Sequence, residues 1–337
     1  MSASLVGSEM CIRDRLYNID SLKFLCAFLV VLIHMHTPYQ ESIMPLTRCA
    51  VPCFFIISGY MIFTNDRLKL VEHLKRSIKK MVLILKWSTL LFAIVKLLFA
   101  FKNNDFSILS TKDLGKFILF NENPFGFHLW YIGAYLYVLI IILYLEKCNK
   151  LSYIYWSIPI LLLLDLCFGK YSLVLWHKEF PFYYVRNFAC VGLPYFTIGM
   201  LLKRHKSRVL NFDNLQILAS GGVILFSLTS LAEDRLLTWF DMNATRDHYI
   251  SSTFLAVSLF LLFLSLKQSK VNVFSKLGEK DSLYIYIFHP LFMTFFSVAN
   301  KYLSNMWQEM YLYCSPLIVL AATVLFSKTL RILHICE

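Results

Sequence analysis

Long apolar segments recur along almost the whole chain, and they constrain its fold more than any other feature. Ten segments approach the roughly 20 mostly apolar residues that a helix needs to cross the hydrocarbon core of a bilayer. A segment in lipid must satisfy its own backbone hydrogen bonds, and a continuous apolar run does so as an α-helix. We therefore predict an all-α fold, a polytopic integral membrane bundle of about ten transmembrane helices. The predicted spans are residues 19–37, 47–64, 78–101, 126–145, 151–168, 185–202, 215–232, 249–266, 282–299 and 311–327.

Composition favours a single domain embedded in the membrane. Hydrophobic residues make up 58% of the 337 residues and charged residues 16%, whereas soluble domains are about 45–50% apolar and about 25% charged. No stretch between the predicted spans is long enough for a second, soluble domain, so we assign residues 16–337 to one membrane-embedded domain. Residues 1–15 lack the apolar core of a signal peptide and resemble translated adapter sequence, so we expect a non-native leader there.

The distribution of basic residues predicts the topology. The formal net charge of +12 would suggest nucleic-acid binding in a soluble protein, but here the basic residues fall between apolar segments, so we expect no nucleic-acid partner. If the N-terminus is cytoplasmic, the inner segments hold 20 Lys and Arg residues and the outer loops hold 8. Cytoplasmic loops carry the excess of Lys and Arg. We therefore predict a multi-pass protein of the cytoplasmic membrane with both termini inside.

The cysteines do not indicate a metal site or a disulfide framework. The nine cysteines lack metal-ligand spacing, and most lie in or beside apolar segments. Buried cysteine behaves as a small apolar residue. We therefore expect packing roles and no bound metal. The cysteines assigned to packing are Cys26, Cys49, Cys53, Cys167, Cys190 and Cys314.

Charged and polar residues inside the predicted spans are the first candidates for a functional site. A charged side chain at mid-bilayer costs about 2.5–3.5 kcal/mol on insertion scales, so such residues usually face the bundle interior. Lys23 and His34 are separated by about 16 Å along the first span and differ by only about 20° in direction, so they share one face. The simpler alternative is a snorkelling lysine and an interfacial histidine. His36 points to another face.

Further polar residues stand at the same predicted outer side or within a span. Arg48 opens the second span, and Arg186 opens the sixth. His128 stands at the start of the fourth span, where an aromatic interfacial belt also explains its neighbours. His289 lies in the middle of the ninth span, directly before Pro290. An ionisable residue at that depth marks a functional site by default, so we include His289 among the catalytic candidates.

A basic cluster precedes the third span on the predicted inner side. It consists of Lys75, Arg76, Lys79 and Lys80. Positive-inside topology and attraction to anionic lipid account for such a cluster. The alternative is a docking site for the phosphates of a cytosolic donor such as coenzyme A.

Five motifs in order give the chain a family resemblance. They read IDSLKFLCAFLVVLIHMH, RCAVPCFFIISGY, HLWYIGAYL, RNFACVGLPYFTIGM and SLYIYIFHPLF. Together they resemble the acyltransferase family 3 membrane proteins over residues 17–330. The resemblance implies transfer of an acyl group, most often acetyl, from cytosolic acyl-CoA to a hydroxyl of a cell-envelope carbohydrate or glycolipid. It implies no permanently bound cofactor.

The resemblance also assigns residues. His34 corresponds to the essential first-helix histidine of the family, and Lys23 stands where the family pattern R-x10-H has arginine. Lysine offers a point charge where arginine offers a planar fork, so the donor contact differs at this position. The arginine- and proline-rich family signature before the third span is also altered here, because KRSIKKMVLILKW contains no proline.

These residues suggest a mechanism. His34 would deprotonate the acceptor hydroxyl, or alternatively carry the acyl group as an acyl-histidine. Arg48 or Arg186 would stabilise the developing oxyanion or orient the acceptor. Coenzyme A would bind near Lys23 and the basic cluster at residues 75–80.

Two other classes of function remain open from the sequence. A secondary transporter also buries charges in a helical bundle, but we find no paired repeat of broken helices. A lipid-scaffolding membrane protein leaves the buried basic residues unexplained. Because we see no extracytoplasmic domain after the tenth span, we expect the acyl group to pass directly to the acceptor or to a separate extracytoplasmic partner.

Overall fold

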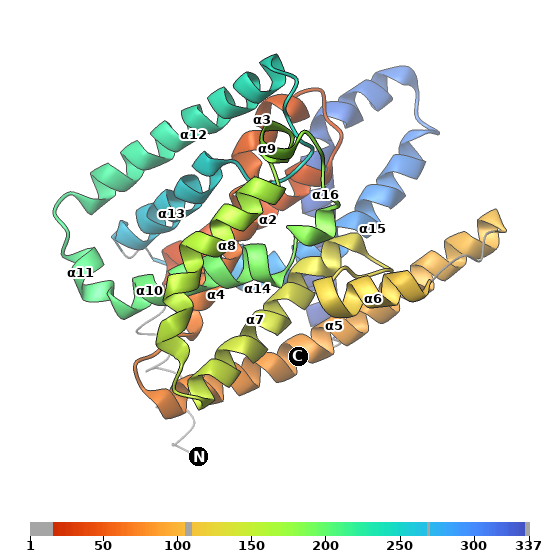
Figure 1. Ribbon diagram of the computed structural model, residues 1–337. Coiled ribbons are helices and arrows are strands. Elements are labelled where there is room, and N and C mark those ends of the chain that lie inside the picture. Colours follow the sequence, from red (N-terminus) through yellow and green to blue (C-terminus); the bar gives the residue numbers. More distant parts are fainter. Residues whose placement is uncertain (1–15, 105–109, 268–269, 334–337) are drawn as a thin grey trace.

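The computed structural model describes residues 16–104, 110–267 and 270–333, and every regular element in those ranges is a helix (Figure 1). The all-α prediction is confirmed, whereas the proposed leader at residues 1–15 lies outside the described residues. The longer helices are α2 (Tyr17–His34), α4 (Ala50–Ile62), α5 (Arg67–Asn103), α7 (Trp130–Lys147), α8 (Ile154–Phe168), α10 (Leu193–Arg204), α12 (Leu215–Trp239), α13 (Ile250–Ser265), α15 (Ser282–Asn300) and α16 (Asn305–Ile332). The shorter ones are α3 (Gln40–Thr47), α6 (Thr111–Phe120), η1 (Phe127–Leu129), η2 (Leu151–Tyr153), α9 (Ser172–Trp176), η3 (Phe182–Tyr184), η4 (Phe188–Gly192), α11 (Lys206–Leu210) and α14 (Val273–Lys280).

The described residues contain eight helical segments that are long and apolar enough to cross a membrane. They are Tyr17–His34, Gln40–Ile62, Arg67–Lys102, Phe127–Lys147, Leu151–Phe168, Leu215–Trp239, Ser282–Asn300 and Asn305–Ile332. Shorter helices occupy the other two predicted spans, α13 in one and η4 with α10 in the other. The described residues therefore form an all-α polytopic bundle, in which eight of the ten predicted spans are helices long and apolar enough to cross a membrane.

The sixth predicted span is broken for a local reason. The side-chain oxygen of Asn187 accepts hydrogen bonds from the backbone nitrogens of Ala189 and Cys190, which caps a short π-helix, η4. The α-helix α10 begins only after it, with Pro194 in its first turn, where a missing N–H has no cost. Single π-turns inside helices are frequently found at functional sites. This one begins at Phe188, two residues after Arg186.

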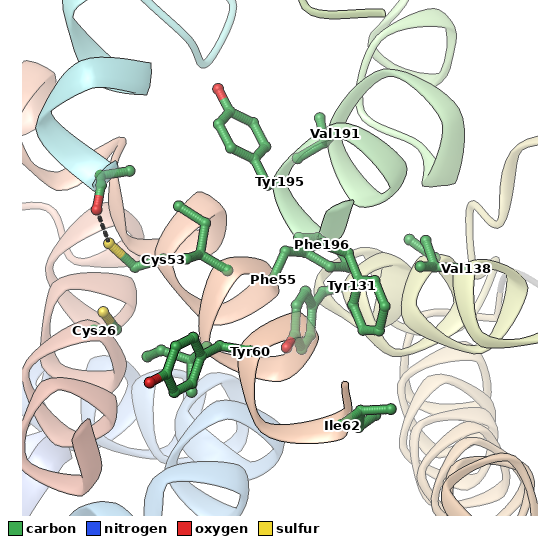
Figure 2. Packing of buried hydrophobic residues seen from close by; sticks show 14 of the residues in the cluster. Cys26, Cys53, Phe55, Tyr60, Ile62, Tyr131, Val138, Val191, Tyr195 and Phe196 are labelled. Atoms are coloured by element: carbon green, nitrogen blue, oxygen red, sulfur yellow. Dashed lines mark hydrogen bonds between the residues drawn. The ribbon is translucent and has the colours of Figure 1, made fainter. Parts of the chain in front are cut away.

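The core is built around α4, which packs against α10, α2 and α13. In the segment Gln40–Ile62, 61% of the apolar window is buried, against 11% in α5, α8 and α12. Figure 2 shows side chains from α4 and α10 meeting, with Phe55 and Tyr60 both fully buried. The thiol of Cys53 donates to the carbonyl of Ala256 on α13. Apolar side chains on α5, α8 and α12 face outward, as lipid-facing helices require.

The cysteines mostly pack as predicted. Within the described residues, Cys26, Cys49, Cys53 and Cys190 are buried and free, whereas Cys167 is half-buried and Cys314 is exposed on α16.

Two glycines allow α4 and α10 to approach closely. A Cβ at Gly199 would fall on the carbonyl oxygen of Ile56, and a Cβ at Gly59 would fall on that of Phe196. Small residues at such crossings let helix backbones pack in membranes. We expect Gly199→Ala to separate the two helices and to destabilise the fold by about 1–3 kcal/mol. In Gly221→Ala on α12, the control, the new methyl group meets open space. A detergent melting curve that is equally unchanged for both variants would contradict this packing.

The bundle has two distinct ends. The chain runs along α2 to α3 at one end, returns through α4, and starts α5 at the other, so the basic residues at the start of α5 are remote from α3. Figure 1 shows α3 and α9 close together at one end and the beginning of α5 at the opposite end.

Candidate active site

A small central cavity of about 40 Å³ lies where α2, α4, α15 and the loop before α13 meet. Its lining includes polar residues from six separate parts of the chain. They are His34, Arg48, His128, Trp130, Arg186, Asp247, His248 and Tyr286. The cavity therefore brings together three of the four predicted catalytic residues, namely His34, Arg48 and Arg186.

A carboxylate holds the two arginines in place. The Nε of Arg186 lies 2.7 Å from Oδ2 of Asp247, and its Nη2 lies 2.9 Å from Oδ1. Arg48 donates from Nη1 to the same Oδ1 at 2.6 Å. The Arg186 guanidinium also lies over the ring of Phe182. A bidentate arginine–carboxylate pair fixes both position and plane.

Two cations and one anion leave this cluster with a net positive charge. Burial alone would raise the pKa of Asp247, but Arg186 and Arg48 outweigh it and hold that pKa well below its ordinary value. Asp247 therefore stays ionised, and the cluster retains one positive charge in excess. Such a fixed positive charge stabilises a developing oxyanion.

Three histidine rings gather beside the arginine cluster. The ring of His34 stacks on that of His289, with centroids 5.2 Å apart. His289 in turn meets the ring of His128 edge-on at 5.7 Å. His289 does not line the cavity and contacts it only through the stacked ring of His34. The fourth predicted catalytic residue thus adjoins the other three through His34.

A backbone carbonyl fixes the orientation of the His289 ring. Nδ1 of His289 lies 3.0 Å from the carbonyl oxygen of Ile285, so it carries the hydrogen and Nε2 is left with its lone pair. Among the described residues, Nε2 of His289 and Nε2 of His128 are buried without a hydrogen-bond partner. The described residues contain no cluster of His, Cys, Asp or Glu arranged to hold a metal ion.

His34 and His36 lie in different surroundings because α2 ends between them, and not because they occupy different faces of one span. His34 ends α2 and lines the cavity, whereas His36 lies beyond the helix and is exposed. Lys23 forms an ion pair with Asp20 at 2.9 Å. Lys23 lines neither the central cavity nor the groove along α5 that is described next. Its carboxylate partner, Asp20, lies on the same helix.

A groove of about 790 Å³ runs along α5, which we call the α5 groove. It is lined by one face of α5 from Lys80 to Leu91 and by residues at the junction of α14 and α15, including Lys280 and Ile287. Lys75, Arg76 and Lys79 are exposed on the first part of the same helix. Beyond Leu91, the ring of Phe92 contacts that of His128 at 4.6 Å. The groove thus leads from the basic cluster toward the histidines.

A second recess of about 670 Å³ opens at the other end of the bundle, and we call it the α12 vestibule. Its walls come from α3, from the end of α12 and from the loop before α13, and it shares Arg48 with the central cavity. Lys170 in its wall donates to the carbonyl of Ala244 and lies over the ring of Tyr249. Burial lowers the pKa of Lys170 to about 8.

Comparison with protein families decides the identity of the chain. The sequence model of a family described as acyltransferase domain matches residues 16–327. The chain belongs to this family. It is the family that the five sequence motifs resemble, and together with the apolar helices it makes the chain a membrane acyltransferase. Comparison with curated proteins found no match, and neither did comparison with solved structures.

The structure places three further residues at the site of this acyltransferase. Asp247 joins the two arginines, and His248 lines the cavity with its Nδ1 2.7 Å from Oδ2 of Asp165. Asp165 is an isolated acid in the apolar segment ILLLLDLCF, which was a signal of its own because such residues seldom occur in spans without a role. Asp247 and His248 lie in a loop, and the sequence offered no comparable signal for them.

Proposed function

We propose that this acyltransferase transfers a short acyl group, acetyl above all, from cytosolic acyl-CoA to a hydroxyl of a cell-envelope carbohydrate. The observation that carries the proposal is the position of His34. Its ring lines a cavity beside two arginines, between a groove that starts at a basic cluster and a polar vestibule at the opposite end.

The α5 groove suits the donor. Lys80 and Lys280 at its entrance match the phosphates of coenzyme A, and Arg76 lies one turn earlier on the same face of α5. The distance from Lys80 to Leu91 is about 16 Å along the helix, which is comparable to a pantetheine arm. The thioester would then reach the histidines.

The chemistry at His34 is the transfer of the acyl carbon from sulfur to oxygen. The hydroxyl oxygen of the acceptor forms a bond to the thioester carbonyl carbon, the bond to sulfur breaks, and coenzyme A leaves as the thiolate. The hydroxyl proton passes to a histidine, and the positive cluster of Arg48 and Arg186 stabilises the oxyanion. A variant of this route places the acyl group on His34 first.

The size of the central cavity favours a short acyl chain. Ligand pockets for larger molecules are about 300–1,000 Å³, whereas this cavity is about 40 Å³ and is walled by Val30, Ile33 and Val51. The α12 vestibule is wide and polar enough for a sugar, and Phe182, which is partly exposed, lies in its wall. The acylated product leaves on that side, directly or through a separate extracytoplasmic partner.

The donor site gives a testable prediction. Replacing Lys75, Arg76, Lys79 and Lys80 by glutamine should raise the KM for acyl-CoA by about 10-fold or more, because several phosphate contacts of about 1 kcal/mol each disappear. The kcat should change less. Steady-state kinetics on purified protein measures both.

The control is neutralisation of Lys206 and Arg208 in the α11 segment, which lies outside the α5 groove. It should leave the KM unchanged. If both sets of variants have the same KM for acyl-CoA at matched protein levels, the basic cluster serves topology and not donor binding.

The function itself is tested with purified protein in nanodiscs, radiolabelled acetyl-CoA and an extract of envelope carbohydrate. We expect release of free coenzyme A and appearance of alkali-labile label on the carbohydrate. A secondary transporter would bind or move a solute without cleaving the thioester. Intact acetyl-CoA after prolonged incubation with every carbohydrate fraction would contradict the proposal.

A further inference from the structure

We propose that His248, positioned by Asp165, accepts the proton of the acceptor hydroxyl during acyl transfer. The inference rests on the proposed function and adds a second proton-transfer residue to it. It leaves His34, which lines the same central cavity, to act on the acyl group.

The first support is the geometry of the pair. His248 and Asp165 are both buried, with exposed fractions of 5% and 4%, and the two side chains are joined by a contact of 2.7 Å between Nδ1 and Oδ2. They come from different parts of the chain, since Asp165 lies near the end of α8 and His248 in the loop before α13. A base oriented by a third group is the arrangement that activates hydroxyl nucleophiles in enzymes.

The second support is the tautomer that this contact imposes. A carboxylate only accepts hydrogen bonds, so Nδ1 of His248 carries the hydrogen. The ring nitrogen that remains for the central cavity is Nε2, and in the neutral ring it bears a lone pair. His289 also has its hydrogen on Nδ1, but its Nε2 is enclosed and its ring lies outside the cavity lining.

The third support is the position of His248 between the two recesses. It belongs to the same loop as Asp247, and the next residue, Tyr249, lines the α12 vestibule. His34 is stacked on His289, which meets His128, and the ring of His128 contacts Phe92, the residue after Leu91 of the α5 groove. His248 therefore stands on the acceptor side of the cavity, and His34 on the donor side.

The charged groups around His248 are compatible with a base. Asp165, Asp247 and Arg48 face the ring, and the ring of Tyr195 on α10 lies 6.0 Å away. Burial would lower the pKa of His248, but the two carboxylates outweigh it and raise that pKa above its ordinary value. Raising the pKa strengthens the base and moves the point at which it becomes neutral to higher pH.

In the proposed step Nε2 of His248 takes the hydroxyl proton as the acceptor oxygen bonds to the acyl carbon. The bond from the acyl carbon to its leaving atom breaks. The leaving atom is the sulfur of coenzyme A or, in the two-step route, a ring nitrogen of His34. The imidazolium of His248 then releases its proton to water in the α12 vestibule. Asp165 keeps its contact with Nδ1 of His248 throughout.

The test compares His248→Gln and Asp165→Asn with His36→Gln, an exposed histidine at the same end of α2. We expect His248→Gln to reduce kcat for transfer to carbohydrate by about 10²–10⁴-fold, as loss of a general base does. The Kd for acetyl-CoA should stay within about threefold, since the donor binds in the α5 groove. His36→Gln should behave as wild type.

Asp165→Asn tests the positioning role through the pH profile. The wild-type rate should fall as the pH drops through the pKa of His248, because the protonated ring no longer accepts a proton. Without the carboxylate, burial dominates and lowers the pKa of His248, so the acid limb should move to lower pH. The asparagine amide also favours the wrong tautomer, so the maximal rate should fall by about 10²-fold or more.

The outcomes separate the inference from the function it rests on. A wild-type protein that transfers no acyl group refutes the proposed function. An active wild type with an active His248→Gln variant refutes the inference alone. If His248→Gln fails to bind acetyl-CoA because it does not fold, Asp165→Asn decides. A folded Asp165→Asn variant with an unshifted acid limb means that the pair is structural.

Discussion

His34→Ala should fold and insert normally, yet lose acyl transfer by about 10²–10⁴-fold, the usual cost of removing a histidine from the reacting centre. The ring ends α2 and lines the central cavity, stacked on His289 and met edge-on by Phe127. Among the described residues, the contacts of this ring with Phe127 and His289 are aromatic packing and not hydrogen bonds, so its loss should leave the bundle intact. Acylated carbohydrate in cells, quantified at matched membrane levels, measures the effect.

His36→Ala is the matched control, two residues further along the chain. His36 is exposed beyond the end of α2, so this variant should keep most of the activity. Substantial acyl transfer by His34→Ala would overturn the mechanism even though the family assignment would stand. Equal losses in both variants would point to a defect in the loop between α2 and α3 instead.

Asp247→Asn should cost both activity and stability. It removes the carboxylate that binds Arg48 and Arg186, leaving two guanidinium groups in a largely buried site without their counter-ion. Breaking a buried ion pair typically destabilises by about 3–5 kcal/mol. The two arginines should also lose the alignment needed for the oxyanion, and we expect turnover to fall by at least about 10²-fold. Melting temperature and kcat report the two effects separately.

Asp241→Asn is the control for the same loop. Asp241 is exposed and has a φ of 56°, a left-handed conformation that asparagine adopts readily. This variant should match the wild type in stability and rate. If Asp247→Asn also retains wild-type turnover, the arginine cluster does not stabilise the transition state.

Much of the architecture follows from the sequence because lipid imposes simple rules on it. Spans can be counted from apolar length, and helical geometry puts Lys23 and His34 on one face. Of these two residues, only His34 lines the central cavity. Arg48 and Arg186 could be assigned to one side because both stand at the same end of their spans. The prediction that they gather near His34 agrees with the central cavity.

The rest could not be predicted because it depends on partners far apart in sequence. Asp247 lies 199 residues from Arg48 and 61 from Arg186. No sequence pattern around a loop aspartate indicates such a pairing. The charge pattern that predicts topology depends on Lys and Arg, so it assigns no role to Asp165. Asp20, the ion-pair partner of Lys23, lies one helical turn away from it. A count of Lys and Arg alone does not indicate this pair either.

The central claim is that an acyl group enters through the α5 groove, passes the cavity at His34 and leaves through the α12 vestibule. The sidedness of transfer tests this claim most directly. Proteoliposomes with uniformly oriented protein would receive labelled acetyl-CoA only on the side of Lys80 and carbohydrate only on the other. We predict labelled carbohydrate with wild type and none with His34→Ala. Label that appears only when donor and acceptor share one side would contradict the account.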